Sequence, residues 1–158
     1  MSNNVLVIGY GNDLRCDDAI GQRVAEKIAT QDLANVKSIA VHQLTPELAA
    51  NLANVDLAIF VDACFNCENS KVQVKSLLPA TNSYIAGHLS NPQTLLALTQ
   101  TLYSYYPQTW WVIVPGENFE LGDRLSPVAQ RGVAIALEKI TSLINQAKTN
   151  SSKPMRRR

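Results

Sequence analysis

The sequence lacks long apolar runs and has no large excess of one charge. Its 158 residues include 14 basic and 13 acidic side chains, and four of the basic ones fall within 153–158. The rest of the chain is slightly acidic, which does not suit a nucleic-acid surface. No stretch approaches the roughly 20 apolar residues of a membrane helix. A secretory signal carries basic residues before its apolar segment, and no basic residue precedes the apolar run at 5–8. We expect a cytoplasmic protein that binds neither nucleic acid nor a membrane, with a disordered basic tail at 149–158.

Cysteine is also scarce, with only Cys16, Cys64 and Cys67 in the chain. An odd number of cysteines without a secretory signal predicts reduced thiols. Cys64 and Cys67 form a CxxC motif, but a zinc site would need a second pair of ligands. A thioredoxin-type motif stands at the start of a helix, whereas this one precedes a polar loop. Thiols without a function of their own are therefore favoured over a redox motif.

What the sequence does contain is a regular alternation of apolar runs and helix-periodic segments. Apolar residues make up 46% of the chain and charged residues 17%, a balance typical of globular domains. Strands are expected at 4–8, 37–42, 56–63, 71–77 (as an edge strand) and 109–115. Helices are expected after the acidic pair at 17–18, over 45–55 capped by Thr45, over 91–106 capped by Asn91, and from Ser126 onward. This order predicts an α/β fold, a single-domain three-layer α/β/α sandwich over residues 1–148 with a mostly parallel twisted sheet of about five strands.

Residues 9–18, GYGNDLRCDD, begin like a phosphate-binding glycine loop but end in two acids. The dinucleotide pattern GxGxxG is met by Gly9 and Gly11 but not at Leu14, and a Walker lysine is absent. Carboxylates about 4 Å from a phosphate would each repel it by several kcal/mol. Nucleotide binding is therefore disfavoured. The glycines are interpreted as a tight turn from strand to helix, and Asp17 as a helix cap.

Titratable residues follow several of the predicted strands at their carboxyl ends, where open α/β sheets form their sites. Asp18 follows the first strand, Asp62 ends the third, and His88 lies in the long loop at 77–90. Burial at the end of an apolar strand should raise the pKa of Asp62, and a metal ion would remove that penalty. Two carboxylates and one imidazole suit zinc, nickel or manganese. The alternative is that the three residues lie apart as caps and surface groups, and His42 is equally open to either interpretation.

The stretch VLVIGYGNDLRCDDAIGQRVAEKI, at 5–28, resembles the N-terminal signature of the nickel–iron hydrogenase maturation endopeptidases. The similarity extends to Asp62, to His88 and to FELGDRLSP at 119–127, and so covers nearly the whole chain. The segments at 42–48 and 88–98 resemble the branch that serves bidirectional, NAD(P)-linked hydrogenases of cyanobacteria. The chain departs from the family pattern at Ala19, where glycine is usual, at His42, where many relatives carry an acid, and in its CxxC motif.

The resemblance implies an endopeptidase that removes a C-terminal extension from the hydrogenase large-subunit precursor after nickel insertion. It implies that Asp18, Asp62 and His88 are the catalytic and metal-binding residues, with nickel supplied by the precursor, so that the resting site is empty or holds another divalent metal. A metal-assisted hydrolysis fits these residues, whereas the absence of GxSxG disfavours a serine mechanism. A non-catalytic nickel-checking or carrier module using the same ligands is the alternative. We expect a monomer whose partner is this precursor.

Overall fold

The computed structural model describes residues 3–67, 70–81 and 91–150. The elements are β1 (Val5–Tyr10), a 3₁₀ helix η1 (Cys16–Ala19), α1 (Ile20–Thr30), β2 (Val36–Val41), α2 (Leu48–Leu52), β3 (Leu57–Phe65), β4 (Gln73–Leu77), α3 (Pro92–Tyr103), β5 (Gln108–Gly116) and α4 (Pro127–Asn150).

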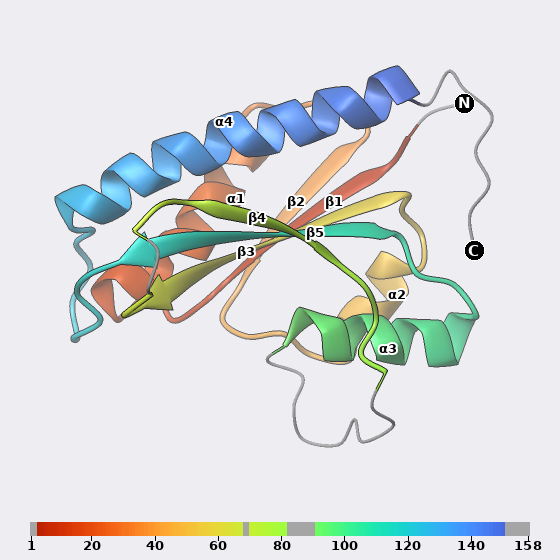
Figure 1. Cartoon of the computed structure of the whole chain (residues 1–158), viewed down its shortest axis with the longest axis horizontal. Coiled ribbons are helices and arrows are strands. Elements are labelled where there is room, and N and C mark those ends of the chain that lie inside the picture. The colour runs from red at the N-terminus through yellow and green to blue at the C-terminus, as the bar shows by residue number, and fades with distance from the viewer. Residues whose placement is uncertain (1–2, 68–69, 82–90, 151–158) are drawn as a thin grey trace.

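The five strands form one sheet in the order β2-β1-β3-β5-β4. The first four of these are parallel, and β4 pairs antiparallel with β5 at the edge. Helices α1 and α4 cover one face of the sheet, and α2 and α3 cover the other (Figure 1). The predicted α/β/α sandwich with a mostly parallel sheet of about five strands is confirmed.

The core has two parts, one on each face of the sheet, because side chains alternate along a strand. On the α1 and α4 face, Val7, Ile59 and Val112 pack against Ile20 and Ile140. The opposite face holds a second cluster under α2 and α3. Its largest members are Leu6, Ile8, Tyr10, Phe60, Leu52, Leu95 and Leu96. The central strand β3 is buried from Leu57 to Val61 and becomes partly exposed at Asp62. The boundary between core and solvent thus falls at the residue that the sequence singled out.

The expected helix starts at Asn91 and Ser126 are confirmed. Asn91 accepts a hydrogen bond from the backbone N–H of Gln93 at 2.8 Å, and Ser126 Oγ accepts one from Ala129 at 3.1 Å. The expected cap by Thr45 is wrong, since α2 begins only at Leu48 and has no side-chain cap. The carbonyl of Thr45 instead closes a turn by accepting from the backbone N–H of Leu48.

At the C-terminal end, α4 runs to Asn150, two residues past the expected boundary at 148. The basic stretch at 151–158 lies outside the described residues. Among the helices of the described part of the chain, none is long and apolar enough to cross a membrane.

Candidate active site at the carboxyl edge of the sheet

The glycine turn after β1 packs α1 tightly against the sheet. Gly11 has a φ of +145°, which only glycine adopts readily, and a Cβ there would overlap the carbonyl of Asp18. A Cβ on Gly9 would overlap the carbonyl of Gly21, and one on Gly21 would lie 2.5 Å from the carbonyl oxygens of Tyr10 and Val61. In a dinucleotide-binding loop, the third glycine allows the helix to pack closely against the strand. Here Gly21 of α1 has that role. No spacing rule applied to the sequence would have identified it.

Asp18 lies in η1 directly over this turn. Its carboxylate Oδ2 accepts a hydrogen bond from the backbone N–H of Asn12 at 2.9 Å, and the side chain is half-buried. Asn12 in turn accepts from the backbone N–H of Leu14 through its own side chain. The turn therefore fixes the carboxylate of Asp18 at the carboxyl edge of the sheet through a backbone donor.

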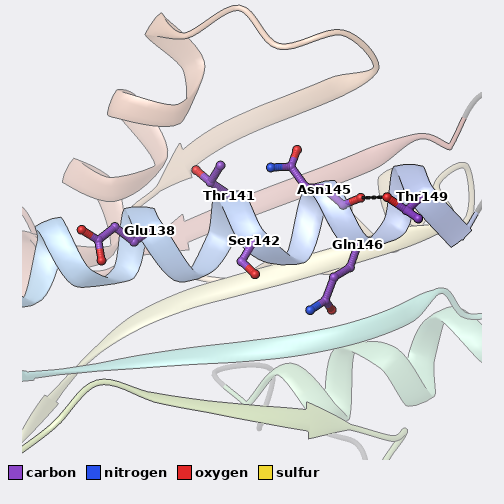
Figure 2. A pocket seen from close by; sticks show the side chains of 6 residues that line it. All are labelled: Glu138, Thr141, Ser142, Asn145, Gln146 and Thr149. Carbon is purple, nitrogen blue, oxygen red and sulfur yellow. Dashed lines mark hydrogen bonds between the residues drawn. The ribbon is translucent and has the colours of Figure 1, made fainter.

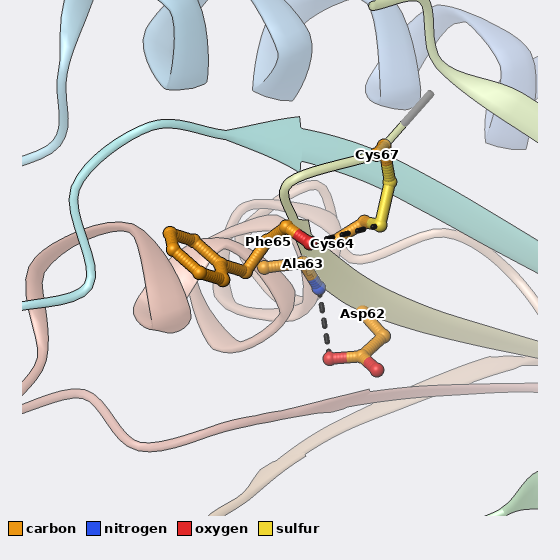
Figure 3. Close-up of a disulfide and its surroundings, with 5 residues drawn as sticks. All are labelled: Asp62, Ala63, Cys64, Phe65 and Cys67. Carbon is orange, nitrogen blue, oxygen red and sulfur yellow. Dashed lines mark hydrogen bonds between the residues drawn. A yellow bond between two sulfur atoms is a disulfide. The ribbon is translucent and has the colours of Figure 1, made fainter. Parts of the chain in front are cut away.

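Asp62 is half-buried near the end of β3, and its Oδ1 accepts a hydrogen bond from the backbone N–H of the adjacent Ala63 at 2.8 Å (Figure 3). Loss of hydration on burial raises its pKa to about 7; the Ala63 hydrogen bond acts in the opposite direction, and the negative charge of Asp18 adds to the increase. The pKa increase expected from the sequence is confirmed. The structure also brings Asp18 and Asp62 close enough for one charge to act on the other.

Two buried polar atoms near Asp62 have no hydrogen-bond partner among the described residues, namely Tyr10 Oη and Trp111 Nε1. Tyr10 ends β1, one residue past the paired Gly9 and Val61, so it lies beside Asp62 on the same face of the sheet. Burial raises the pKa of Tyr10, and the charge of Asp62 raises it further. A weak hydrogen-bonding interaction between Tyr10 and Asp62 also contributes, raising the pKa of Tyr10 and lowering that of Asp62, although the pair lies outside the geometry of a full hydrogen bond. Tyr10 and Trp111 thus add unused donors to the site, which the sequence did not indicate.

His88 lies outside the described residues, so the structure does not test whether it meets the two carboxylates. Within the ranges 3–67, 70–81 and 91–150, no group of three His, Cys, Asp or Glu side chains is arranged to hold a metal ion. His42 follows β2 and is exposed. The described part of the site is therefore a pair of carboxylates with an excess of negative charge, which suits a cation.

Asp17, adjacent to Asp18, has a different role from the helix cap that the sequence predicted. Its side chain is fully buried and caps no helix of its own. Oδ2 accepts from the backbone N–H groups of Glu117 (2.7 Å) and Asn118 (3.0 Å) and from Ser126 Oγ (2.7 Å), and Oδ1 accepts from the backbone N–H of Ser126 (2.8 Å). Burial raises the pKa of Asp17, but the hydrogen bonds from Ser126, Asn118 and Glu117 lower it by more, to below its usual value. Asp17 therefore anchors the loop at 117–126 and the capping residue of α4.

The same loop is joined to the glycine turn through its backbone. Arg15 and Gly122 form an isolated parallel bridge, in which Gly122 donates to the carbonyl of Leu14 and accepts from the N–H of Cys16, both at 2.9 Å. The N–H of Asp17 also donates to the carbonyl of Asn118 at 2.8 Å. Two segments about a hundred residues apart thus form one braced unit beside the carboxylates.

The cysteine prediction is partly wrong. Cys16 is free, as expected, and buried, but Cys64 and Cys67 form a disulfide (Figure 3). The chain turns back at Asn66, which has a φ of +62°, and this brings the two Cα atoms to 5.8 Å. That separation lies within the usual range for a disulfide. The pairing follows from a local turn that the motif spacing alone did not reveal.

Two surface hollows among the described residues lie away from the carboxylates. One, of about 480 Å³, lies along α4 and is lined by polar side chains from Glu138 to Thr149 (Figure 2). The other, of about 430 Å³, is lined by Leu77, Tyr106 and Thr109 among others, and so lies at the amino end of β5, opposite the site. Neither brings together titratable groups in the way that the carboxyl edge does.

No protein-family profile and no curated protein matches the sequence. Solved structures do match it. The hydrogenase maturating endopeptidase HybD from Escherichia coli superposes with a TM-score of 0.70 at 23% identity, over 91% of this chain and 93% of that one. The [NiFe] hydrogenase maturation protease HycI from Thermococcus kodakarensis gives 0.72 at 18% identity, over 90% and 93%. HybD from the same archaeon gives 0.68 at 19% identity, over 89% and 99%.

The chain has the fold of the hydrogenase maturation proteases. The match covers nearly the full length of the chains on both sides, so the carboxyl edge described above belongs to the shared fold. The expectation drawn from the signature at 5–28 is thereby confirmed for the architecture.

Proposed function

We propose that this protein is a hydrogenase maturation endopeptidase. It removes the C-terminal extension of a nickel-loaded hydrogenase large-subunit precursor. The observation that carries the proposal is the pair of neighbouring carboxylates, Asp18 and Asp62, at the carboxyl edge of a sheet with the fold of these proteases. The signature at 5–28 supports the same assignment independently of the fold.

The electrostatics of the site favour a cation supplied from outside. Asp62 loses hydration and lies near a second carboxylate, and the groups that shift its pKa among the described residues include no cation. In the proposal Asp18, Asp62 and His88 engage the nickel of the precursor, which enters as part of the substrate. A metal ion held by these residues would polarise a carbonyl or lower the pKa of a bound water to about 7.

The residues of the chain supply orientation and proton transfer. A carboxylate with a pKa of about 7, as for Asp62, is poised to accept a proton near neutral pH. The unpartnered hydroxyl of Tyr10 lies beside it and can donate a hydrogen bond to an incoming substrate oxygen. The Asn12 N–H holds Asp18 in place through one of its two carboxylate oxygens. We place this activity in the cytoplasm and assign it to a monomer.

The test is a processing assay with purified protein and precursor in nickel-loaded and nickel-free forms, read by mass spectrometry of the C-terminal peptide of the hydrogenase. We expect cleavage of the loaded form only, and at least a hundredfold slower cleavage by Asp18→Asn and Asp62→Asn. Asp32→Asn is the matched control, because Asp32 is exposed at the end of α1 with a φ of +50° that asparagine tolerates. Full cleavage by either site variant would refute the roles assigned here. Binding of the loaded precursor without any cleavage would instead favour a nickel-checking module.

A further inference from the structure

A group of large apolar side chains lies exposed beside the carboxylates. Leu14 is 65% exposed, Phe65 64% and Leu121 75%, and Phe119 packs edge-on against Phe65 with ring centroids 5.1 Å apart. We call these four residues the apolar platform. Single exposed apolar residues are ordinary, but a cluster of them with a polar rim is typical of an interaction surface.

The backbone pairs the two loop segments that carry Leu14 and Leu121. In the parallel bridge between Arg15 and Gly122, the preceding residues Leu14 and Leu121 stand on neighbouring positions of the two segments. Neighbouring positions of paired segments direct their side chains to the same side. Phe119 is tied to the same unit, because its carbonyl accepts from the guanidinium of Arg15 at 3.4 Å.

The two loop segments of the platform are braced against each other by hydrogen bonds. The four hydrogen bonds to Asp17 and the Arg15–Gly122 bridge fix the segments at 12–18 and 117–126 to each other. An exposed apolar surface on a braced backbone loses little conformational entropy when a partner covers it. Asp17 therefore contributes to binding by holding the platform, without contacting the partner itself.

The platform adjoins the proposed active site on two sides. Leu14 belongs to the turn that carries Asp18, and Phe65 follows Asp62 by three residues on β3. The ring of Phe65 points away from the carboxylate of Asp62 (Figure 3), so the platform lies next to the reacting groups and does not cover them. A chain that lies across the platform can thus continue into the site.

The rim of the platform is acidic. Four exposed carboxylates, those of Asp13, Glu117, Glu120 and Asp123, lie in the two loop segments, and Asp18 lies beside them. Three guanidinium groups oppose these five charges, and two of the three donate to loop carbonyls. The three guanidinium groups belong to Arg15, Arg23 and Arg124. Arg15 donates to the carbonyl of Phe119, and Arg23 donates to that of Asp123. The surface left for a partner is apolar in the middle and negative at its edge.

We propose that the apolar platform docks an apolar segment of net positive charge in the C-terminal region of the precursor, and so positions the scissile bond at Asp18 and Asp62. This inference rests on the proposed function and adds the chemistry of the segment that is recognised. The apolar side chains supply affinity, and the acidic rim selects and orients a basic segment.

The experiment compares the double variant Leu14→Ser/Leu121→Ser with the control Leu102→Ser. Leu102 is 59% exposed and lies in the last turn of α3, which leads into the amino end of β5, opposite the site. We expect the double variant to raise the KM for nickel-loaded precursor about tenfold or more with an unchanged kcat, and to weaken binding of the same precursor in biolayer interferometry by a similar factor. Leu102→Ser should change neither value. Circular dichroism checks that each variant is folded.

A charge series tests the rim. Glu117→Lys/Glu120→Lys should raise KM at low salt and reduce the dependence of KM on ionic strength, whereas Glu138→Lys on α4 should do neither. Equal KM values for the double leucine variant and Leu102→Ser would overturn the proposal, as would a loss confined to kcat. A wild-type dimer in light scattering that becomes monomeric in Leu14→Ser/Leu121→Ser would assign the platform to a second copy of the chain, and would also overturn it.

The binding arm separates this inference from the proposed function. If the wild-type protein binds precursor through Leu14 and Leu121 but never shortens it, the platform stands and the endopeptidase assignment fails. If it cleaves precursor equally well with and without the two leucines, the assignment stands and the platform fails.

Discussion

Replacement of Asp17 gives the sharpest prediction for stability, because this one carboxylate receives four hydrogen bonds from residues about a hundred positions away. Asp17→Ala leaves three backbone N–H groups and the Ser126 hydroxyl without their acceptor. A buried donor left unpaired costs about 1–3 kcal/mol. Glu117 and Asn118 are exposed, so water can reach part of the gap, and the lower end of that range applies to each of the four donors. We expect a loss of about 4 kcal/mol in the free energy of unfolding.

Asp17→Asn should cost less, about 2 kcal/mol. An amide oxygen at the Oδ2 position keeps the bonds from Glu117, Asn118 and the Ser126 hydroxyl, although they are weaker without the charge. The amide nitrogen then meets the N–H of Ser126, which is a contact between two donors. The order of stability should therefore be wild type, then Asp17→Asn, then Asp17→Ala.

Urea unfolding at pH 7 measures these differences, with Glu138→Ala on the exposed side of α4 as the control. The pH dependence gives a second readout. The lowered pKa of Asp17 means that its stabilisation is present above the pKa of the unfolded chain and is lost as pH falls through the folded value. Wild type should therefore lose more stability than Asp17→Asn between about pH 6 and pH 2. If Asp17→Ala unfolds within about 1 kcal/mol of the Glu138→Ala control, the loop at 117–126 does not depend on this carboxylate and the reasoning fails.

Three further predictions concern the strand edge and the turn. Gly21→Ala should destabilise the fold by about 2 kcal/mol, because the new Cβ would lie 2.5 Å from the carbonyl oxygens of Tyr10 and Val61. A melting temperature no lower than that of Glu26→Ala, an exposed position on the same helix, would contradict this prediction. The raised pKa of Asp62 means that stability from this group is present at low pH and is lost as pH rises through about 7. Asp62→Asn should therefore be more stable than wild type at pH 8 and equally stable at pH 3. The difference at pH 8 is at most about 4 kcal/mol, because the pKa of Asp62 rises from its ordinary value to about 7 on folding. Alkylation of the denatured protein should label one thiol without reductant and three after reduction, since Cys64 and Cys67 are paired and Cys16 is free; three adducts without reductant would show that the pair is reduced.

Local patterns were enough to predict most of the fold. The strands at β1, β3 and β5 follow from continuous apolar runs, and the start of α3 follows from Asn91 and Pro92, because caps act within one turn. The raised pKa of Asp62 also follows locally, since Asp62 directly follows the buried apolar run of β3 from Leu57 to Val61.

Features that depend on distant partners could not be predicted in this way. Asp17 looked like a cap because its four donors, at 117, 118 and 126, are far away in the sequence. The packing role of Gly21 depends on how closely α1 approaches β1 and β3, which no local pattern reports. The short α2 and the Cys64–Cys67 pair depend on turns whose backbone angles the residue types permit but do not dictate.

The brace between the glycine turn and the loop at 117–126 also has a consequence for the order of folding. Contacts across a hundred residues close large loops and form late. A nascent chain that ends before residue 117 can pair β1 with β2 and β3, but the carboxylate of Asp17 then has none of its four donors. The brace beside the turn that carries Asp18 forms only when the loop at 117–126 and the start of α4 have been synthesised. Synthesis of the residues after 116 is thus the step that completes the brace beside the two carboxylates, and a chain truncated before them would fold part of its core without it.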